Sequence, residues 1–357
     1  MMRTRTAQIC IDHEALRHNF QRVKSLAGDS KVIAVIKANA YGHGAQAAAD
    51  AFSQADAFAL ATAGEAIALR HSGITRPLIA LQGCFDSEEL KTLSELNIQT
   101  VVHQPHQIAL LEQCPELKLD VWLKVDTGMH RLGMPLAMVE SAYQRLRACK
   151  SVGHLRLMSH LANADEPDHA KNNEQLSALD RLHETLNLET SMANSAALVA
   201  LPESRLQWVR PGIMLYGSSP LLAKTAAELD LKAAMNFDSK LIAVQQLQQG
   251  DEIGYGSTWQ CRQAMRVGIV AAGYADGYPR HAASGTPVWI NNTLCPLLGR
   301  VSMDSLCVDL QGVAAEVGDR VVLWGKELSV DVVAEHAGTI SYELLCHAGA
   351  GFVSSTV

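Results

Sequence analysis

The sequence of 357 residues has no surplus of positive charge and no long apolar run. Its formal net charge is -7, so it carries no excess of basic side chains with which to neutralise a phosphate backbone. No uninterrupted apolar segment approaches the roughly 20 residues that a membrane-spanning helix needs, and no apolar segment of the signal-peptide type follows the N-terminus. We therefore expect no nucleic-acid partner, no membrane segment and a cytoplasmic location.

Metal-binding and disulfide patterns are also missing. The eight cysteines are scattered, and none has the C-x-x-C spacing of a zinc or iron–sulfur site. The pair His103 and His106 lacks the i, i+4 spacing that brings two histidines to one helix face. We expect reduced cysteines that act as small apolar residues, and no metal.

What the sequence does have is a repeating alternation of short apolar segments and helical stretches. Eight such units over about 210 residues match the count and length of a (β/α)8 barrel of the TIM type. A doubly wound sheet is the rival, but no glycine-rich dinucleotide turn follows the first strand. The expected strands are Val32–Ile36, Phe58–Ala61, Pro77–Leu81, Thr100–Val102, Asp120–Val125, His154–Met158, Thr190–Ala193 and Gln207–Val209.

The pattern changes near Phe237, where helical periodicity largely stops. Short strand-like runs follow one another with frequent turn residues, such as Gln249-Gly250-Asp251 and Asn291-Asn292. We expect a second, mostly β domain and a boundary near residues 231–236. The predicted division is a barrel domain of residues 1–233 and a β domain of residues 234–357.

Lys37 lies at the end of the apolar run Val32–Ile36, which is typical of a strand buried on both faces. Parallel strands of α/β proteins present their chemistry at their carboxyl ends. The amine is either a cation for an anionic substrate or a desolvated nucleophile that forms a Schiff base. Alternatively, it is a strand-end lysine that extends to the surface.

Polar and glycine residues follow several of the other predicted strands, which would place them on the same face of a barrel. The hydroxyls of Tyr41 and Ser195 and the backbone N–H groups around Gly212 and Ile213 suit a phosphate group, which barrels often bind near strands seven and eight. The full set is Lys37, Tyr41, Asp126, Thr127, Gly128, Arg131, His160, Asn194, Ser195, Arg210, Gly212 and Ile213.

Eight motifs in chain order resemble those of the pyridoxal-phosphate-dependent alanine racemases. They are VIKANAYGHG (35–44), KVDTGMHRLG (124–133), SHLANAD (159–165), ANSA (193–196), VRPGIMLYG (209–217), GYGSTW (254–259), GYADGYPR (273–280) and GRVSMD (299–304). The resemblance implies a fold-type III barrel, a C-terminal β domain and a homodimer whose active sites combine residues of both subunits. It also implies an isomerase that interconverts L-alanine and D-alanine with pyridoxal 5'-phosphate.

The resemblance assigns the two proton-transfer groups. Lys37 would hold the cofactor as a Schiff base and serve as the base on the D side, and Tyr255 of the partner subunit would serve the L side. Two bases are needed because one group does not reach both faces of a planar carbanion. His160 and Arg210 would form a hydrogen-bonded chain behind Tyr255, and Arg210 would also contact the pyridine nitrogen.

The resemblance also assigns the binding groups. Arg131 would contact the phenolic oxygen of the cofactor and the substrate carboxylate, and Lys124, if carbamylated, would orient Arg131. Met303 and Asp304 of the partner would border the substrate carboxylate, and Tyr274 would line the entrance. The cofactor would be held by Tyr41, Asn194, Ser195, Gly212, Ile213 and Tyr342.

The chain departs from the family pattern at its end, where the family's final strand is replaced by residues 347–357, so we expect an atypical tail there. Two alternatives to an alanine racemase stay open. One is a racemase of broader preference, for example for serine, and the other is a pyridoxal-phosphate carrier without activity. The motifs also fit either D-alanine supply for peptidoglycan or alanine breakdown, because both uses need identical chemistry.

Overall fold

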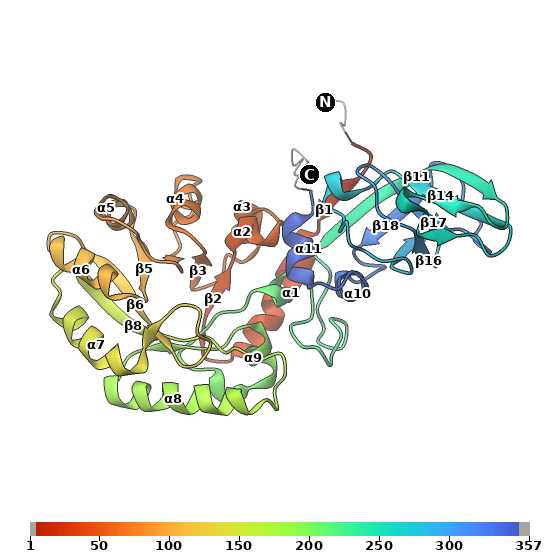
Figure 1. Ribbon diagram of the computed structural model, residues 1–357. Coiled ribbons are helices and arrows are strands. Elements are labelled where there is room, and N and C mark those ends of the chain that lie inside the picture. The colour runs from red at the N-terminus through yellow and green to blue at the C-terminus, as the bar shows by residue number, and fades with distance from the viewer. Residues whose placement is uncertain (1–4, 350–357) are drawn as a thin grey trace.

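The computed structural model describes residues 5–349 and contains a barrel beside a second, antiparallel sheet (Figure 1). Eight parallel strands pair in the order β5-β4-β3-β2-β10-β9-β8-β6, and β5 also pairs with β6, which closes the barrel. These strands are β2 (Lys31–Val35), β3 (Ala57–Leu60), β4 (Leu78–Ala80), β5 (Ile98–Val102), β6 (Leu119–Asp126), β8 (Val152–Met158), β9 (Thr190–Ser191) and β10 (Trp208–Val209). The predicted barrel is confirmed, and closure rejects the doubly wound alternative.

Helices cover the outside of the barrel (Figure 1). Several begin at side chains that satisfy the free N–H groups of a helix N-terminus, as Asp12 does for α1 and Asp86 for α5. The helices are α1 (His13–Ala27), α3 (Ala45–Ala51), α4 (Ala63–His71), α5 (Ser87–Glu95), α6 (Pro105–Gln113), α7 (Val139–Ala148), α8 (Ala170–Leu186) and α9 (Ser195–Ala200). The segment α2 (Lys37–Tyr41) is a left-handed turn that follows β2. The short β7 (Met134–Pro135) pairs with β6.

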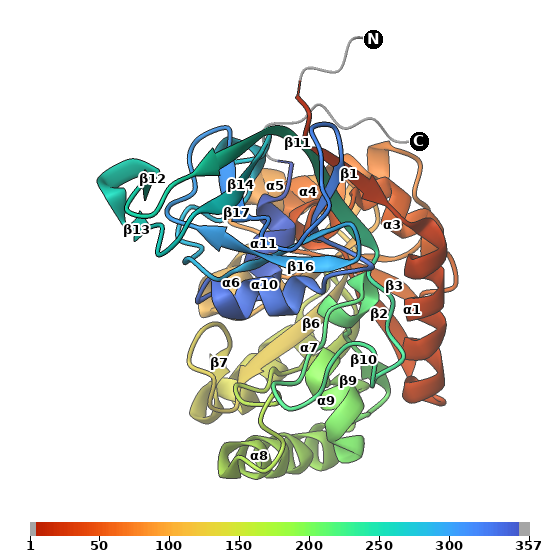
Figure 2. The same ribbon diagram turned by 90° about the vertical axis from the view of Figure 1, so that its right-hand side faces the viewer.

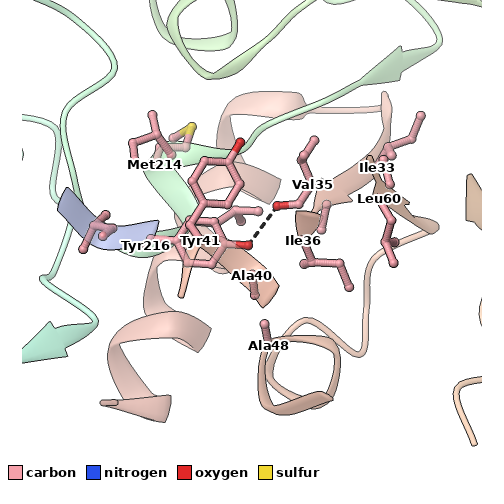
Figure 3. Close-up of a cluster of buried hydrophobic side chains, with 14 of the residues drawn as sticks. Ile33, Val35, Ile36, Ala40, Tyr41, Ala48, Leu60, Met214 and Tyr216 are labelled. Carbon is pink, nitrogen blue, oxygen red and sulfur yellow. Dashed lines mark hydrogen bonds between the residues drawn. The ribbon is translucent and has the colours of Figure 1, made fainter. Parts of the chain in front are cut away.

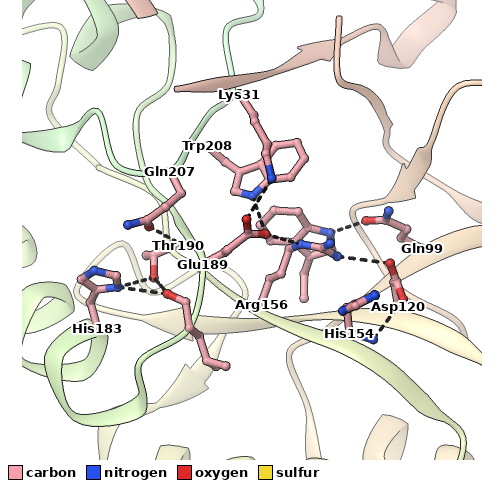
Figure 4. Close-up of polar contacts among 12 residues, drawn as sticks. Lys31, Gln99, Asp120, His154, Arg156, His183, Glu189, Thr190, Gln207 and Trp208 are labelled. Atoms are coloured by element: carbon pink, nitrogen blue, oxygen red, sulfur yellow. Dashed lines mark hydrogen bonds and ion pairs between the residues drawn. The ribbon is translucent and has the colours of Figure 1, made fainter. Parts of the chain in front are cut away.

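An arginine fills the barrel near the amino ends of its strands (Figure 4). The guanidinium of Arg156 lies 5.5 Å from the Trp122 ring and 5.7 Å from the Trp208 ring. It donates to Glu189 over 2.9 Å and to Asp120 over 3.3 Å, and Lys31 also binds Glu189. These contacts stabilise the fold and take no part in the chemistry, because barrel chemistry occurs at the opposite face.

The second sheet is antiparallel, which confirms the predicted mostly β domain. Its strands pair in the order β1-β11-β14-β17-β16-β15-β18, and β11 also pairs with β18, so the last six form a closed ring. They are β1 (Gln8–Ile11), β11 (Met235–Leu247), β14 (Met265–Val270), β15 (Pro287–Ile290), β16 (Thr293–Leu298), β17 (Leu306–Asp309) and β18 (Arg320–Trp324). The Asn291-Asn292 turn joins β15 to β16 with both residues at positive φ, as a two-residue hairpin loop requires.

Strand β1 is the element that sequence reasoning missed, because it lies before the barrel in the chain but joins the second sheet beside β11. Two further helices, α10 (Val330–His336) and α11 (Ser341–His347), also interrupt the β pattern of this domain. They lie between the second sheet and the barrel (Figure 1). The unusual sequence tail falls mostly in residues 350–357, outside the described residues.

Helix α11 packs directly on the loop that follows Lys37. A β-carbon at Gly42 would lie 2.2 Å from the Leu345 carbonyl oxygen, so only glycine fits this approach. The Tyr216 hydroxyl donates to the Val35 carbonyl over 2.8 Å and the Tyr216 ring packs on Tyr41 (Figure 3). The chemistry-bearing loop is therefore fixed from both the barrel and the second domain. Among residues 5–349, no helix is long and apolar enough to cross a membrane.

Candidate active site

Cationic and imidazole side chains from four barrel strands meet at the carboxyl ends of those strands. Lys37 follows β2, Lys124 lies near the end of β6, and His160 and Arg210 follow β8 and β10. Arg131 lies in the loop between β6 and β7, and its charge acts on three of the others. The structure thus brings together five of the residues that the sequence singled out.

The backbone after Lys37 is left-handed. Ala38, Asn39, Ala40 and Tyr41 have φ angles of 52°, 52°, 55° and 52°, and none is glycine. A left-handed turn costs an L-residue about 1–2 kcal/mol, and such strain persists where surrounding contacts over-determine the conformation. This conformation could not be predicted from the sequence, because none of the four residues is a glycine.

Two side chains of the loop itself help to hold this turn. The Asn39 Oδ1 accepts from the Ala45 N–H over 2.9 Å, which ties the turn to the start of α3. The buried His43 ring contacts the carbonyl oxygens of Ala40 at 3.1 Å and Tyr41 at 2.9 Å through Nδ1. Because both partners are acceptors, Nδ1 carries the hydrogen of a neutral ring.

Arg210 is buried and makes three hydrogen bonds. Its guanidinium donates to the Ser191 Oγ over 2.7 Å, the Ser159 carbonyl over 2.7 Å and the His160 Nδ1 over 3.1 Å. Because a guanidinium has no acceptor, His160 must accept through Nδ1 and keep its hydrogen on Nε2. Burial and then the Arg210 charge hold the pKa of His160 well below its usual value.

The two lysines have lowered pKa values for the same physical reasons. Burial, followed by the Arg131 charge, lowers the pKa of Lys37. Burial, followed by the charges of Arg210 and Arg131, lowers the pKa of Lys124 to about 7. Both amines therefore have a larger neutral, nucleophilic fraction at neutral pH than an exposed lysine has.

A cradle of hydroxyls lies beside this cationic group. The Tyr41 hydroxyl has no hydrogen-bond partner within residues 5–349, and a β-carbon on Gly212 would lie 2.6 Å from it. The Ser195 Oγ accepts from the Gly212 N–H over 2.8 Å, so that N–H already has a partner. Tyr342 on α11 packs 5.9 Å from the Tyr41 ring, centroid to centroid.

The other residues that the sequence predicts to hold a cofactor fit this cradle to different degrees. Ile213 follows Gly212 directly and begins the short 3-10 turn Ile213–Tyr216. Asn194 caps α9 by accepting from the Ala197 N–H over 2.9 Å, so its side chain shapes the loop. An unpaired tyrosine hydroxyl, a serine at a helix start and a glycine without room for a side chain suit the oxygens of a phosphate.

Tyr255 lies far from this group on the surface of the second domain. Its side chain is 69% exposed in the turn between β12 (Glu252–Ile253) and β13 (Trp259–Gln260), which projects from the sheet (Figure 2). Within residues 5–349 no hydrogen bond, ion pair or ring contact joins it to Lys37. Within a single chain, Tyr255 therefore lies apart from Lys37.

Met303, Asp304 and Tyr274 also lie exposed on the second domain. Two residues that the sequence did not single out hold this surface. Arg5 donates to the buried Asp276 and, over 2.6 Å, to Asp304. The Tyr274 N–H donates to the Ser302 carbonyl over 3.1 Å, which fixes the two loops against each other.

No group of three or more potential metal ligands occurs within residues 5–349. The chemistry that the geometry offers is a nucleophilic amine with a lowered pKa, a cationic surround and a phosphate cradle. This combination suits a phosphorylated aldehyde better than a simple anionic substrate. The other cations can bind an anion, which leaves the Lys37 amine at the left-handed turn to form a Schiff base.

Comparison with known proteins gives one consistent family. The alanine racemase N-terminal domain family matches residues 11–220, and the alanine racemase C-terminal domain family matches residues 234–354. An alanine racemase of Vibrio parahaemolyticus is 47% identical over 344 residues, which cover 96% of each chain. One of Nitrosococcus oceani is 49% identical over 342 residues, covering 95% of this chain and 96% of that relative.

Solved structures agree with the sequence relatives. The biosynthetic alanine racemase of Pseudomonas aeruginosa has a TM-score of 0.93 and 42% identity, over 97% of this chain and 98% of that one. The Bartonella henselae alanine racemase with covalently bound pyridoxal phosphate has a TM-score of 0.90 and 27% identity, over 99% of each chain. The two domain matches, the near-full-length relatives and the shared fold show that this chain belongs to the alanine racemase family.

Proposed function

We propose that this chain interconverts L-alanine and D-alanine with pyridoxal 5'-phosphate joined to Lys37. The carrying observation is the position of Lys37, a partly buried amine with a lowered pKa at a left-handed turn beside Arg131, Arg210 and a phosphate cradle. The cofactor supplies an electron sink that makes the substrate Cα–H acidic enough for a side-chain base. The protein residues then bind, orient and exchange the proton.

Lys37 Nζ is the base and acid on one face of the substrate Cα. Burial and the Arg131 charge lower its pKa toward the working pH, which favours both roles, because proton transfer is most efficient when the pKa lies near that pH. Arg131 binds the substrate carboxylate with its fork of donors. Lys124 orients Arg131, and its pKa of about 7 leaves a neutral amine that carbon dioxide can carbamylate.

Tyr255 of the partner subunit is the group on the opposite face. An ordinary tyrosine, with a pKa of about 10, is a weak base at neutral pH and needs donors that stabilise its phenolate. The Arg210–His160 pair offers such a donor, because His160 accepts from Arg210 through Nδ1 and keeps its Nε2–H free to donate. Arg210 would contact the pyridine nitrogen of the cofactor, where its positive charge would disfavour protonation.

A homodimer explains why Tyr255 lies exposed and away from Lys37 in a single chain. The barrel within residues 1–233 would hold the cofactor, and residues 234–357, whose sheet β1 joins, would form the domain that reaches the partner's site. On this arrangement Met303 and Asp304 border the partner's substrate carboxylate, and Tyr274 lines the entrance. Tyr41, Ser195, Ile213 and Tyr342 would hold the cofactor phosphate, and Gly212 and Asn194 would shape the loops around it.

Subunit mixing tests the activity and the shared site together. Lys37→Ala and Tyr255→Phe homodimers should each be inactive in racemising alanine. After unfolding and refolding of an equal mixture, half of the dimers are mixed and each has one intact site, so about a quarter of wild-type activity should return. If the wild type is active but the refolded mixture regains no activity, each site is built from one chain.

The two alternatives are separated by exchange in deuterated water. A carrier without activity would bind the cofactor but leave the Cα–H of L-alanine unexchanged. A racemase would exchange this hydrogen for deuterium, and the optical rotation of the alanine solution would fall to zero. Comparing kcat/KM for alanine and serine decides the breadth of substrate preference. We also propose a cytoplasmic location, since all eight cysteines are free, as is usual in a reducing compartment.

A further inference from the structure

Glu65 is tied to the catalytic turn although it belongs to the next β-α unit. It lies in the first turn of α4, where it forms a capping box with Thr62. Its Oε2 accepts from the Ala61 N–H over 2.8 Å. Its Oε1 leaves the helix and accepts from the Ala38 N–H over 2.8 Å, which is the peptide bond that follows Lys37.

The Glu65 carboxylate therefore both caps α4 and binds the backbone of the turn after Lys37. The Ala38 N–H begins the run of four left-handed residues, a conformation that costs each L-residue about 1–2 kcal/mol. A strained segment of this kind persists only when its surroundings hold it. The hydrogen bond from Ala38 to an ionised carboxylate is of the stronger, charge-assisted type. Glu65 therefore holds the start of the turn against the rigid end of β3.

The Glu65 carboxylate also acts electrostatically on the cationic site around Lys37. The groups that act on Lys37 are Arg131 from the loop after β6, Arg210 after β10, Cys346 on α11 and Glu65 on α4. Lys124 on β6 also acts on this set. Glu65 and Cys346 oppose the cations and raise the pKa of Lys37, and the Cys346 thiol itself has a pKa raised by burial, so it is neutral at pH 7. Among the described groups that act on Lys37, Glu65 is the only carboxylate.

We propose that Glu65 is a positioning residue for racemisation, which fixes the backbone of Lys37 through Ala38 and sets the charge balance under which the Lys37 amine exchanges protons. This inference rests on the proposed function, because it concerns the step in which Lys37 acts as acid or base. It adds a residue outside the barrel mouth motifs to the machinery of the site.

The chain contains a matched control for this residue. Glu89 occupies the same place in the next unit, in the first turn of α5, and its Oε2 accepts from the Phe85 N–H over 2.8 Å. Its own N–H donates to Asp86, as the Glu65 N–H donates to Thr62. Within the described residues, no hydrogen bond or ion pair joins Glu89 to the turn of residues 37–41. Replacing it removes the same local hydrogen bond without touching the Lys37 loop.

The decisive experiment compares pH profiles of kcat for Glu65→Gln and Glu89→Gln in both directions. From D-alanine, Lys37 must be neutral to take the proton, so kcat rises with pH through the pKa of Lys37 in the substrate complex. Removal of the Glu65 charge lowers that pKa, so the rising limb should shift to lower pH by about 0.5–1 pH unit. From L-alanine, Lys37 must be protonated to donate the proton, so the falling limb should shift to lower pH by the same amount. Glu89→Gln should shift neither limb.

A second readout does not depend on turnover. Hydrogen exchange in the peptide that contains residues 36–44 should be at least about tenfold faster in Glu65→Gln than in the wild type, because the Ala38 N–H loses its charged acceptor. Glu89→Gln should leave this peptide unchanged. Borohydride reduction and peptide mapping should still label Lys37 in both variants, which shows that the fold and the cofactor linkage persist.

The outcomes separate this proposal from the proposed function. If the wild type racemises alanine but Glu65→Gln shifts neither limb and leaves exchange of residues 36–44 unchanged, Glu65 has no positioning role and the racemase assignment stands. Equal effects of Glu65→Gln and Glu89→Gln would also overturn it, because they would reflect helix capping alone. If the wild type does not racemise alanine, the proposed function fails first.

Discussion

The backbone at Gly212 lies so close to Tyr41 that a β-carbon there would be 2.6 Å from the Tyr41 Oη. The nearest other atoms are the Tyr41 Cζ at 3.4 Å and the Val35 Cβ at 3.7 Å. The hydroxyl is therefore the main obstacle to a side chain at this position. This relationship places the Tyr41 hydroxyl and the loop after β10 in one cradle.

Gly212→Ala should weaken cofactor binding, because the methyl group displaces the Tyr41 hydroxyl from the phosphate cradle. We expect about a tenfold rise in the cofactor dissociation constant and a stability loss of about 1–3 kcal/mol. In a Tyr41→Phe background the same change should cost clearly less, since the opposing oxygen is gone. Fluorescence titration of the four proteins measures the coupling. Full additivity would show that the two positions act independently.

Arg156→Met should destabilise the barrel without changing its chemistry. The substitution keeps an apolar stem between Trp122 and Trp208 but leaves Asp120 and Glu189 without their shared cation. We expect a loss of about 2 kcal/mol in the free energy of unfolding and an unchanged kcat. The exposed pair Arg145–Glu112 is the control, and Arg145→Met should cost less than about 1 kcal/mol. Urea denaturation gives both values, and equal losses would contradict a special role for Arg156.

Acid should destabilise the protein through His43. Burial lowers the pKa of His43 to about 4, against about 6.5 in an unfolded chain, so the unfolded state binds more protons between these values. Stability is therefore full above pH 6.5 and is lost as the pH falls toward 4. The loss from pH 7 to pH 5 should be about 2 kcal/mol for this group.

The test is His43→Asn, because its amide N–H can still donate to the Ala40 and Tyr41 carbonyls. The variant should be less stable than the wild type at pH 7, since it loses ring packing on Tyr216. Its stability should change less between pH 7 and pH 5, as followed by urea midpoints. A slope as steep as that of the wild type would mean that other groups carry the acid sensitivity.

Lys124 should react with carbon dioxide in a pH-dependent manner. Carbamylation needs the neutral amine, and with a pKa of about 7 its fraction rises as the pH increases through that value. Labelled bicarbonate should give a carbamate carbon signal that grows from pH 6 to pH 8 and is absent from Lys124→Arg. A signal that persists in Lys124→Arg would place the modification elsewhere.

Much of the barrel was predictable because each strand carries its own local signal. A buried parallel strand must be apolar on both faces, and the run Val32–Ile36 shows this directly. The end of such a strand also fixes where Lys37 lies. Strand β1 escaped prediction because its pairing with β11 joins residues more than two hundred positions apart, and a four-residue segment has no local pattern that names its partner.

Glu65 and Arg5 escaped prediction for a related reason. Glu65 reads as an ordinary capping residue of α4, and only the fold shows that its second oxygen reaches the Ala38 N–H. Arg5 lies before the barrel in sequence, and only the pairing of β1 brings it to Asp276 and Asp304. Both contacts join segments whose separation along the chain hides them.

The sequence by itself determined the order of strands, the change from helical to β pattern and the residue types at the strand ends, because these depend on local hydrophobic spacing and on motifs. Only the tertiary structure decided the left-handed turn after Lys37, the hydrogen-bond direction between Arg210 and His160, and the separation of Tyr255 from Lys37 within one chain. These features depend on contacts between distant segments, whose geometry is set when the barrel and the second sheet close.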